Sequence, residues 1–165
     1  MDTILRHQGT NIGGINSIFW IFSEDVQAFN MSWDTGYCSI GFVSGKNWNS
    51  LYGTPESMVL ESDCLPMPGG MKFTYKIKVL VPKDRSDVEM ILVKMTLRNL
   101  LVLAVDKNNT ARVFGTKDNP MKMTYKLLKP ALLEGFTGYE ILFSGDFSSP
   151  CAFYTIPSGS GISST

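Results

Sequence analysis

The strongest pattern in the chain is a regular alternation of apolar and mostly basic positions between residues 71 and 81. The apolar set is Met71, Phe73, Tyr75, Ile77, Val79 and Val81, and between its members stand Lys72, Thr74, Lys76 and Lys78. A repeat of two residues places alternate side chains on opposite faces of a β-strand. The pattern therefore predicts a long strand with one buried face and one solvated, basic face.

A second stretch repeats this alternation, with Met121, Met123, Tyr125 and Leu127 set against Lys122, Thr124 and Lys126. Short apolar runs bounded by turn residues predict further strands at 15–22, 36–43, 48–52, 57–62, 99–105, 110–115, 139–144 and 151–156. Residues 99–105 are apolar without helical spacing, which predicts a strand buried on both faces that forms a hairpin with 110–115. The Pro and Gly content of residues 65–70 predicts a loop.

One helix is predicted, at residues 87–97. Ser86 and Glu89 have the spacing of a capping box, and Val88, Ile91, Leu92 and Met95 form a helical stripe. We therefore expect a mainly β fold, a single-domain β-sandwich or barrel with this helix packed on the sheet. Residues 1–14 are expected to form a flexible N-terminal arm, 15–156 the β-rich domain and 157–165 a flexible C-terminal tail.

The composition points to a protein whose surface is partly covered by partners. The 165 residues contain 15 basic and 15 acidic side chains, and charged residues make up 18% where about 25% is usual. A net charge of zero argues against a general nucleic-acid binder. The charge is uneven along the chain, since residues 1–70 carry a net −5 and residues 71–165 a net +5. Either copies pack head to tail, acidic face against basic face, or the two halves interleave and the asymmetry averages out.

The residue types that common enzymes need are not found in the required spacing. Three distant cysteines and a single His7 give no zinc pattern, and the odd cysteine count favours reduced thiols. There is no Gly-x-Ser-x-Gly motif, and Gly45-Lys46 is followed by Asn47, which does not fit a phosphate loop. Glu24 and Asp25 fit a solvated turn. We expect no catalytic, metal-binding or cofactor-binding residues, no cofactor and no enzymatic activity.

Two sets of residues remain as candidate interface or lumen contacts. One set consists of lysines on two predicted strands, namely Lys72, Lys76 and Lys78 on the first and Lys122, Lys126 and Lys129 on the second. If the two strands are neighbours, these lysines can bind phosphates. Otherwise they form an exposed sheet face or protect a strand edge from pairing. Trp20 fits the core. Trp33 and Trp48 lie among turn residues, which suggests contact anchors, so these two complete the candidate set.

Strand and turn signatures stand at residues 112–121, 138–145 and 150–154, and a looser pattern of the same kind at 15–22 and 48–55. In these signatures the chain resembles small virion proteins of tailed phages and prophages of Bacteroidetes, which are found among their neck, tail-ring and tail-tube components. The resemblance implies a β-sandwich or barrel protomer, a closed ring of many copies, no catalysis and passage of DNA through the centre.

The expected function is therefore that of a structural virion protein, a protomer of a ring in the neck or tail. Its partners are other copies of itself and neighbouring tail or portal proteins, with DNA only transiently in the lumen. The alternative is a β-sandwich module that binds a receptor or carbohydrate. The N-terminus lacks a signal-peptide pattern and no apolar stretch approaches the ~20 residues of a membrane span, so we expect synthesis in the host cytoplasm, assembly into the virion and no membrane partner.

Overall fold

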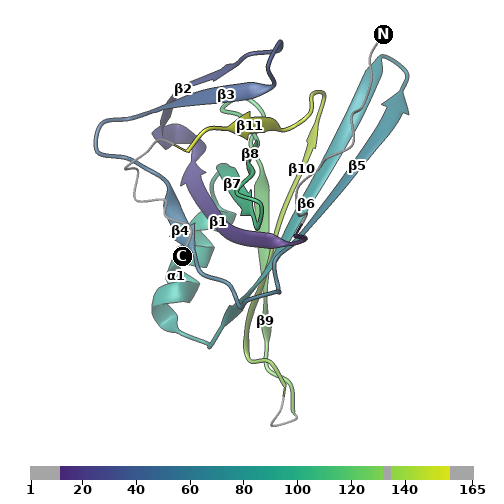
Figure 1. The fold of residues 1–165 in the computed structure, drawn as a ribbon. Helices are drawn as coiled ribbons and strands as arrows, with labels where there is room; N and C mark the ends of the chain where they lie inside the picture. The colour runs from purple at the N-terminus through teal and green to yellow at the C-terminus, as the bar shows by residue number, and fades with distance from the viewer. Residues whose placement is uncertain (1–11, 132–134, 157–165) are drawn as a thin grey trace.

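Two β-sheets and one helix make up the described part of the chain (Figure 1). The computed structural model describes residues 12–131 and 135–156. The elements are β1 Ile15–Phe22, a 3-10 turn Ser23–Asp25, β2 Val26–Met31, β3 Tyr37–Phe42, β4 Asn49–Leu51, β5 Val59–Met67, β6 Gly70–Pro82, α1 Ser86–Thr96, β7 Leu100–Asp106, β8 Ala111–Phe114, β9 Lys122–Leu128, β10 Gly138–Phe147 and β11 Ala152–Tyr154. Seven strands form one sheet in the order β2-β3-β11-β8-β7-β1-β4, and four form the other in the order β5-β6-β10-β9. The predicted fold class is confirmed as a sandwich-like single domain whose sheets do not close into a barrel.

The core lies on both sides of the seven-stranded sheet. Between the two sheets, Ile77, Val79, Ile141 and Phe143 from the four-stranded sheet pack against the helix and the central strands, and all four are fully buried. On the other face, a second cluster gathers under β2 and β3. Because β7 runs through the middle of the seven-stranded sheet, its six residues from Leu100 to Val105 are all buried, as their apolar run predicts.

The helix begins one residue earlier than predicted. Its N-cap residue is Arg85, which makes no side-chain capping bond, and Ser86 is the first helical residue, so the predicted capping box is wrong. Leu92 and Met95 are buried against the core as expected, whereas Ile91 is 46% exposed. The helix packs against β9, and the Thr96 hydroxyl lies 3.9 Å from the sulfur of Met123.

The predicted loop at residues 65–70 is wrong, because strands occupy most of this segment. Leu65 to Met67 continue β5, and Gly70 already belongs to β6. Pro66 is tolerated because β5 is an edge strand, where one missing N–H need not break the sheet. Gly69 and Gly70 take φ values of 105° and 145°, which close the turn. The sequence does not predict β2. The polar residues 23–25 indicate the end of β1, whereas in the structure they form a short turn that leads directly into a second strand.

The hairpin of β5 and β6 projects away from the body of the molecule (Figure 1). All nine residues of β5 are exposed. β5 pairs with β6 from Val59 opposite Lys78 to Met67 opposite Gly70, and we call this segment, residues 59–78, the arm. At its far end β10 stops at Phe147, opposite Phe73, so the last pairs of the arm form a two-stranded ribbon. Such a ribbon gains little from burial in an isolated chain.

Candidate assembly surface

The outer face of the four-stranded sheet carries five of the six candidate lysines. Lys72, Lys76 and Lys78 of β6 lie on the face opposite to the buried Ile77 and Val79. Through β10, the register places Lys76 in one row with Ser144 and Lys122, and Lys126 shares that face. The two basic strands are therefore not neighbours, since β10 separates them, but their lysines do gather on one uncovered face.

Ion pairs within this face neutralise part of its charge. Lys72 lies 3.0 Å from Asp146, and Lys78 lies 2.6 Å from Glu140. The Thr74 hydroxyl donates a hydrogen bond to Asp146, and with Lys72 beside it this holds the pKa of the Asp146 carboxyl below its usual range. In the described part of the chain, Lys76, Lys122 and Lys126 have no carboxylate within 4.0 Å. These three ammonium groups are available to a partner.

The two edges of this sheet differ in charge. β5 contributes Glu61 and Asp63 to the outer face and contains no basic residue. β9 contributes Lys122 and Lys126 to the same face and contains no acidic residue. The two halves of the chain interleave in the sheets, so most of the asymmetry in the sequence averages out over the faces. The charge asymmetry remains at the two edges of the four-stranded sheet, acidic at β5 and basic at β9.

Lys129 lies apart from the other lysines. It follows the end of β9 and forms an ion pair with Asp84, which also accepts a hydrogen bond of 2.6 Å from the Tyr139 hydroxyl. Lys129, and then Tyr139, hold the pKa of the Asp84 carboxyl below its usual range, and the hydrogen bond to this carboxylate raises the pKa of Tyr139 to about 12. The cluster ties the segment before α1 to the ends of β9 and β10, which is a structural role.

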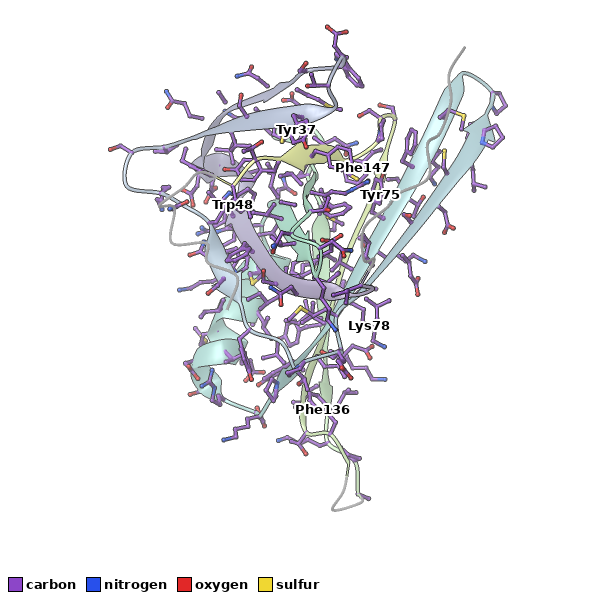
Figure 2. All side chains as sticks on the ribbon, in the orientation of Figure 1. Tyr37, Trp48, Tyr75, Lys78, Phe136 and Phe147 are labelled. Atoms are coloured by element: carbon purple, nitrogen blue, oxygen red, sulfur yellow. The ribbon has the colours of Figure 1, made fainter. Side chains whose placement is uncertain are left out.

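The two candidate tryptophans have different environments. Trp33 lies in the turn between β2 and β3 and is 71% exposed, so it is accessible to a partner. Trp48, labelled in Figure 2, is 9% exposed, and its ring packs edge-on against Phe42 and Tyr154. Its position among turn residues suggested exposure, but the loop before β4 folds over the core. Trp48 therefore contributes packing.

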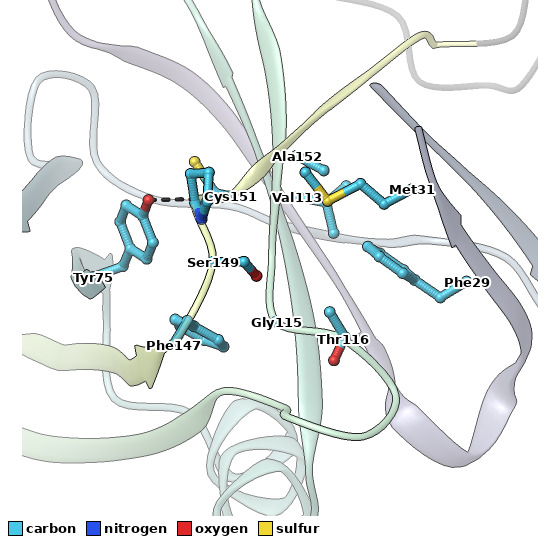
Figure 3. Close-up of a pocket in the computed structure, with 11 residues that line it drawn as sticks. Phe29, Met31, Tyr75, Val113, Gly115, Thr116, Phe147, Ser149, Cys151 and Ala152 are labelled. Atoms are coloured by element: carbon cyan, nitrogen blue, oxygen red, sulfur yellow. Dashed lines mark hydrogen bonds between the residues drawn. The ribbon is translucent and has the colours of Figure 1, made fainter. Parts of the chain in front are cut away.

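Two hollows lie between elements of the described chain. One cavity of about 20 Å³ lies between β2, β8 and the segment after β10, lined mainly by apolar side chains (Figure 3). There the Cys151 N–H donates a hydrogen bond of 3.0 Å to the Tyr75 hydroxyl, and burial raises the pKa of Tyr75 to about 12. A wider groove of about 790 Å³ runs between α1 and β4. Its walls are mostly apolar.

Among residues 12–131 and 135–156, no three His, Cys, Asp or Glu side chains come together as a metal site would require. The same residues contain no helix of the length and apolarity that crossing a bilayer demands. No protein-family model, curated protein or solved structure matches the chain.

Proposed function

We propose that this chain is a structural protomer of a ring in the neck or tail of a tailed phage, through which DNA passes. The observation that carries the proposal is the pair of strand edges at the two ends of one sheet, acidic on β5 and basic on β9, with both sets of charges on the same face. An unpaired edge is a template for another strand. When β5 of one copy pairs with β9 of the next, each copy uses two different edges, and the contact is heterologous.

The faces of the strands limit the register of this pairing. Side chains opposite each other in antiparallel strands point to the same face, so Glu61 and Asp63 must oppose the even-numbered positions of β9. With Asp63 opposite Thr124, Glu61 lies opposite Lys126, and Asp63 lies diagonally between Lys122 and Lys126. Both carboxylates then have an ammonium group within cross-strand reach.

The same register gives the joined sheet the stagger that a closed barrel needs. Within one copy, Thr124 lies in the row of Lys78, whereas Asp63 lies in the row of Thr74, so neighbouring copies are displaced by four residues along β6. Four residues correspond to about 13 Å along the strands, and four strands to about 19 Å across them. The resulting tilt of about 35° lies at the low end of the roughly 35–45° of closed barrels. The join therefore favours closure into a ring.

In such a ring the outer face is the natural lining of the lumen. The inner face of the sheet is covered by the seven-stranded sheet and α1, whereas no element of the described chain covers the face of Lys76 and Lys122. Basic side chains alternating with Glu140 and Asp146 give a face of mixed charge. The affinity for DNA rises with the number of phosphates that basic side chains neutralise. Because acidic side chains offset part of the basic charge, we expect this face to bind the phosphate backbone weakly, so that DNA can move past it.

The test joins the two edges through cysteines. In a Cys64→Ser background, Asp63→Cys and Thr124→Cys together are expected to form disulfides between copies under mild oxidation, giving a ladder of cross-linked oligomers on denaturing gels. Each single variant lacks one partner of the proposed disulfide and cannot form it, so the two single variants, which keep Cys38 and Cys151, are the controls. Light scattering on the wild-type chain is expected to give a ring-sized mass that falls as salt rises. A double variant without a ladder would count against the edge pairing.

The binding-module alternative needs exposed aromatic side chains gathered at one end of the sandwich. The two most exposed aromatic residues of the described chain are Trp33 and Tyr52, at 71% and 70%. Trp33 follows β2 and Tyr52 follows β4, and these two strands form opposite edges of the seven-stranded sheet. Tyr52 is therefore separate from Trp33 and from Tyr37, which is 49% exposed on the same hairpin as Trp33. A chain that stays monomeric at all salt concentrations would favour the binding module over the ring.

A further inference from the structure

The inner face of the arm is mainly apolar and becomes exposed toward the tip. Its less buried part consists of Leu60, Ser62, Cys64 and Pro66 on β5 with Met71 and Phe73 on β6. At the base of the arm, Tyr75 and Ile77 are buried on this same face, and Phe73 packs against the core. Leu60 is 38% exposed and Met71 is 45% exposed. Every charged side chain of the arm lies on the other face, and Ser62 is the one polar side chain among the six residues named.

A second uncovered apolar surface lies on α1. Met90, Val93 and Leu97 are spaced by three and four residues, which places them on one side of the helix, and they are 60%, 39% and 79% exposed. Thr96, which contacts Met123 of β9, and Ile91, in the groove toward β4, lie on the two flanks of the helix. The stripe of Met90, Val93 and Leu97 lies between these flanks, on the side of the helix opposite to the buried Leu92 and Met95. Of its three residues, Val93 lies nearest the β9 flank, one turn before Thr96.

We propose that the inner face of the arm packs on the α1 stripe of the neighbouring copy. The inference rests on the proposed ring, because the pairing of Asp63 with Thr124 places Cys64 and Pro66 of one copy alongside Met123 and Met121 of the next. Met121 bridges to Leu100, the first residue of β7, which lies three residues after Leu97, the C-cap of α1. In this arrangement, the arm of one copy extends from the paired edge toward the C-terminal end of α1 of the next copy, where Leu97 lies.

The two surfaces fit each other chemically. Neither contains a charged side chain, and the acidic Glu89 and basic Lys94 lie beside the stripe, where they remain solvated at its rim. The contact repeats the packing inside each copy, where the same face of the sheet is covered by the buried side of the same helix. Each ring interface then combines a polar edge, which sets register, with an apolar patch that excludes water.

Two methionines on opposite faces of the arm give a matched test. Met71 lies on the inner face and Met67 on the outer face, and both are about half exposed, at 45% and 53%. Met71→Glu is expected to raise the concentration needed for half-assembly about tenfold or more, because a carboxylate would be buried without a partner. Met67→Glu is expected to change it less than about threefold. On the helix, Leu97→Glu and Ile91→Glu form the corresponding pair.

Direct contact is tested by combining the two sides. Met71→Lys with Leu97→Glu places opposite charges together and is expected to recover most of the assembly that each single change loses. Circular dichroism of each variant as monomer checks that these exposed substitutions leave the fold intact. If Met71→Glu and Leu97→Glu assemble like their controls, or the double variant shows no recovery, the arm contact is overturned. If the Asp63→Cys, Thr124→Cys ladder still forms, the ring survives that result. A wild-type chain that neither assembles nor cross-links overturns both.

Discussion

Reversing the charge at position 61 is the most direct perturbation of the proposed interface. In the register described, Glu61 opposes Lys126 of the neighbouring copy, and cross-strand pairs of opposite charge contribute roughly 0.2–1 kcal/mol. Glu61→Lys replaces this attraction by a repulsion of similar size, so each interface is weakened by about 0.4–2 kcal/mol. This corresponds to a roughly 2–30-fold larger dissociation constant per interface. Lys126→Glu is expected to act in the same way.

Sedimentation velocity at low salt measures this change, because the interaction is screened as ionic strength rises. The control is Asp34→Lys, the same change of charge at an exposed site in the turn between β2 and β3, and it is expected to leave assembly unchanged. The double variant Glu61→Lys, Lys126→Glu restores an opposite pair and should assemble better than either single variant. A double variant no better than the singles, or a control as damaging as Glu61→Lys, would refute the pairing of β5 with β9.

Three further predictions concern the protomer itself. Tyr75→Phe removes the hydrogen bond accepted from the Cys151 N–H and is expected to lower the free energy of unfolding by about 1–2 kcal/mol in urea titrations; an unchanged midpoint would contradict it. Burial raises the pKa of Cys38 to about 11, so a thiol reagent at pH 8 should label the exposed Cys64 at once and Cys38 only as the chain unfolds, as mass spectrometry can follow. Asp146 stabilises the fold above its ordinary pKa of about 4, and this stabilisation is lost as pH falls through its lowered folded-state value. Removing the Thr74 hydroxyl in Thr74→Val should therefore make the melting temperature fall less between pH 6 and pH 2 than in wild type, and an equal fall would argue against this role.

The sequence predicts those parts of the fold that depend on local periodicity. β6 follows from strict alternation, and β7 follows from an apolar run that requires cover on both faces. The arm was divided wrongly at residues 65–70, because Pro and Gly usually signal a loop, and only the sheet order reveals that Pro66 lies at an edge. The capping box at Ser86 failed for a related reason, since spacing alone does not fix where the first helical turn begins.

The candidate surface was predicted in part. Its lysines follow from the alternation, but their arrangement depends on β10, whose position between β6 and β9 is a long-range pairing that no local pattern encodes. The α1 stripe was missed because apolar helical positions are expected to face the core, and Val93 and Leu97 do not. Trp48 shows the opposite error, since turn residues around an aromatic side chain suggest exposure without determining it.

The charges on the two edges disfavour symmetric dimers of this chain. A dimer built from two β5 edges would place Glu61 and Asp63 against their own copies, and one built from two β9 edges would place Lys122 and Lys126 together. Like charges opposite each other in neighbouring strands are destabilising, so both symmetric dimers are disfavoured. Only the pairing of unlike edges satisfies the charges, and that pairing leaves one free edge at each end of any open chain of copies. In the proposed pairing, an open chain of copies loses its last free edges only by closing on itself, so we expect a ring rather than a dimer.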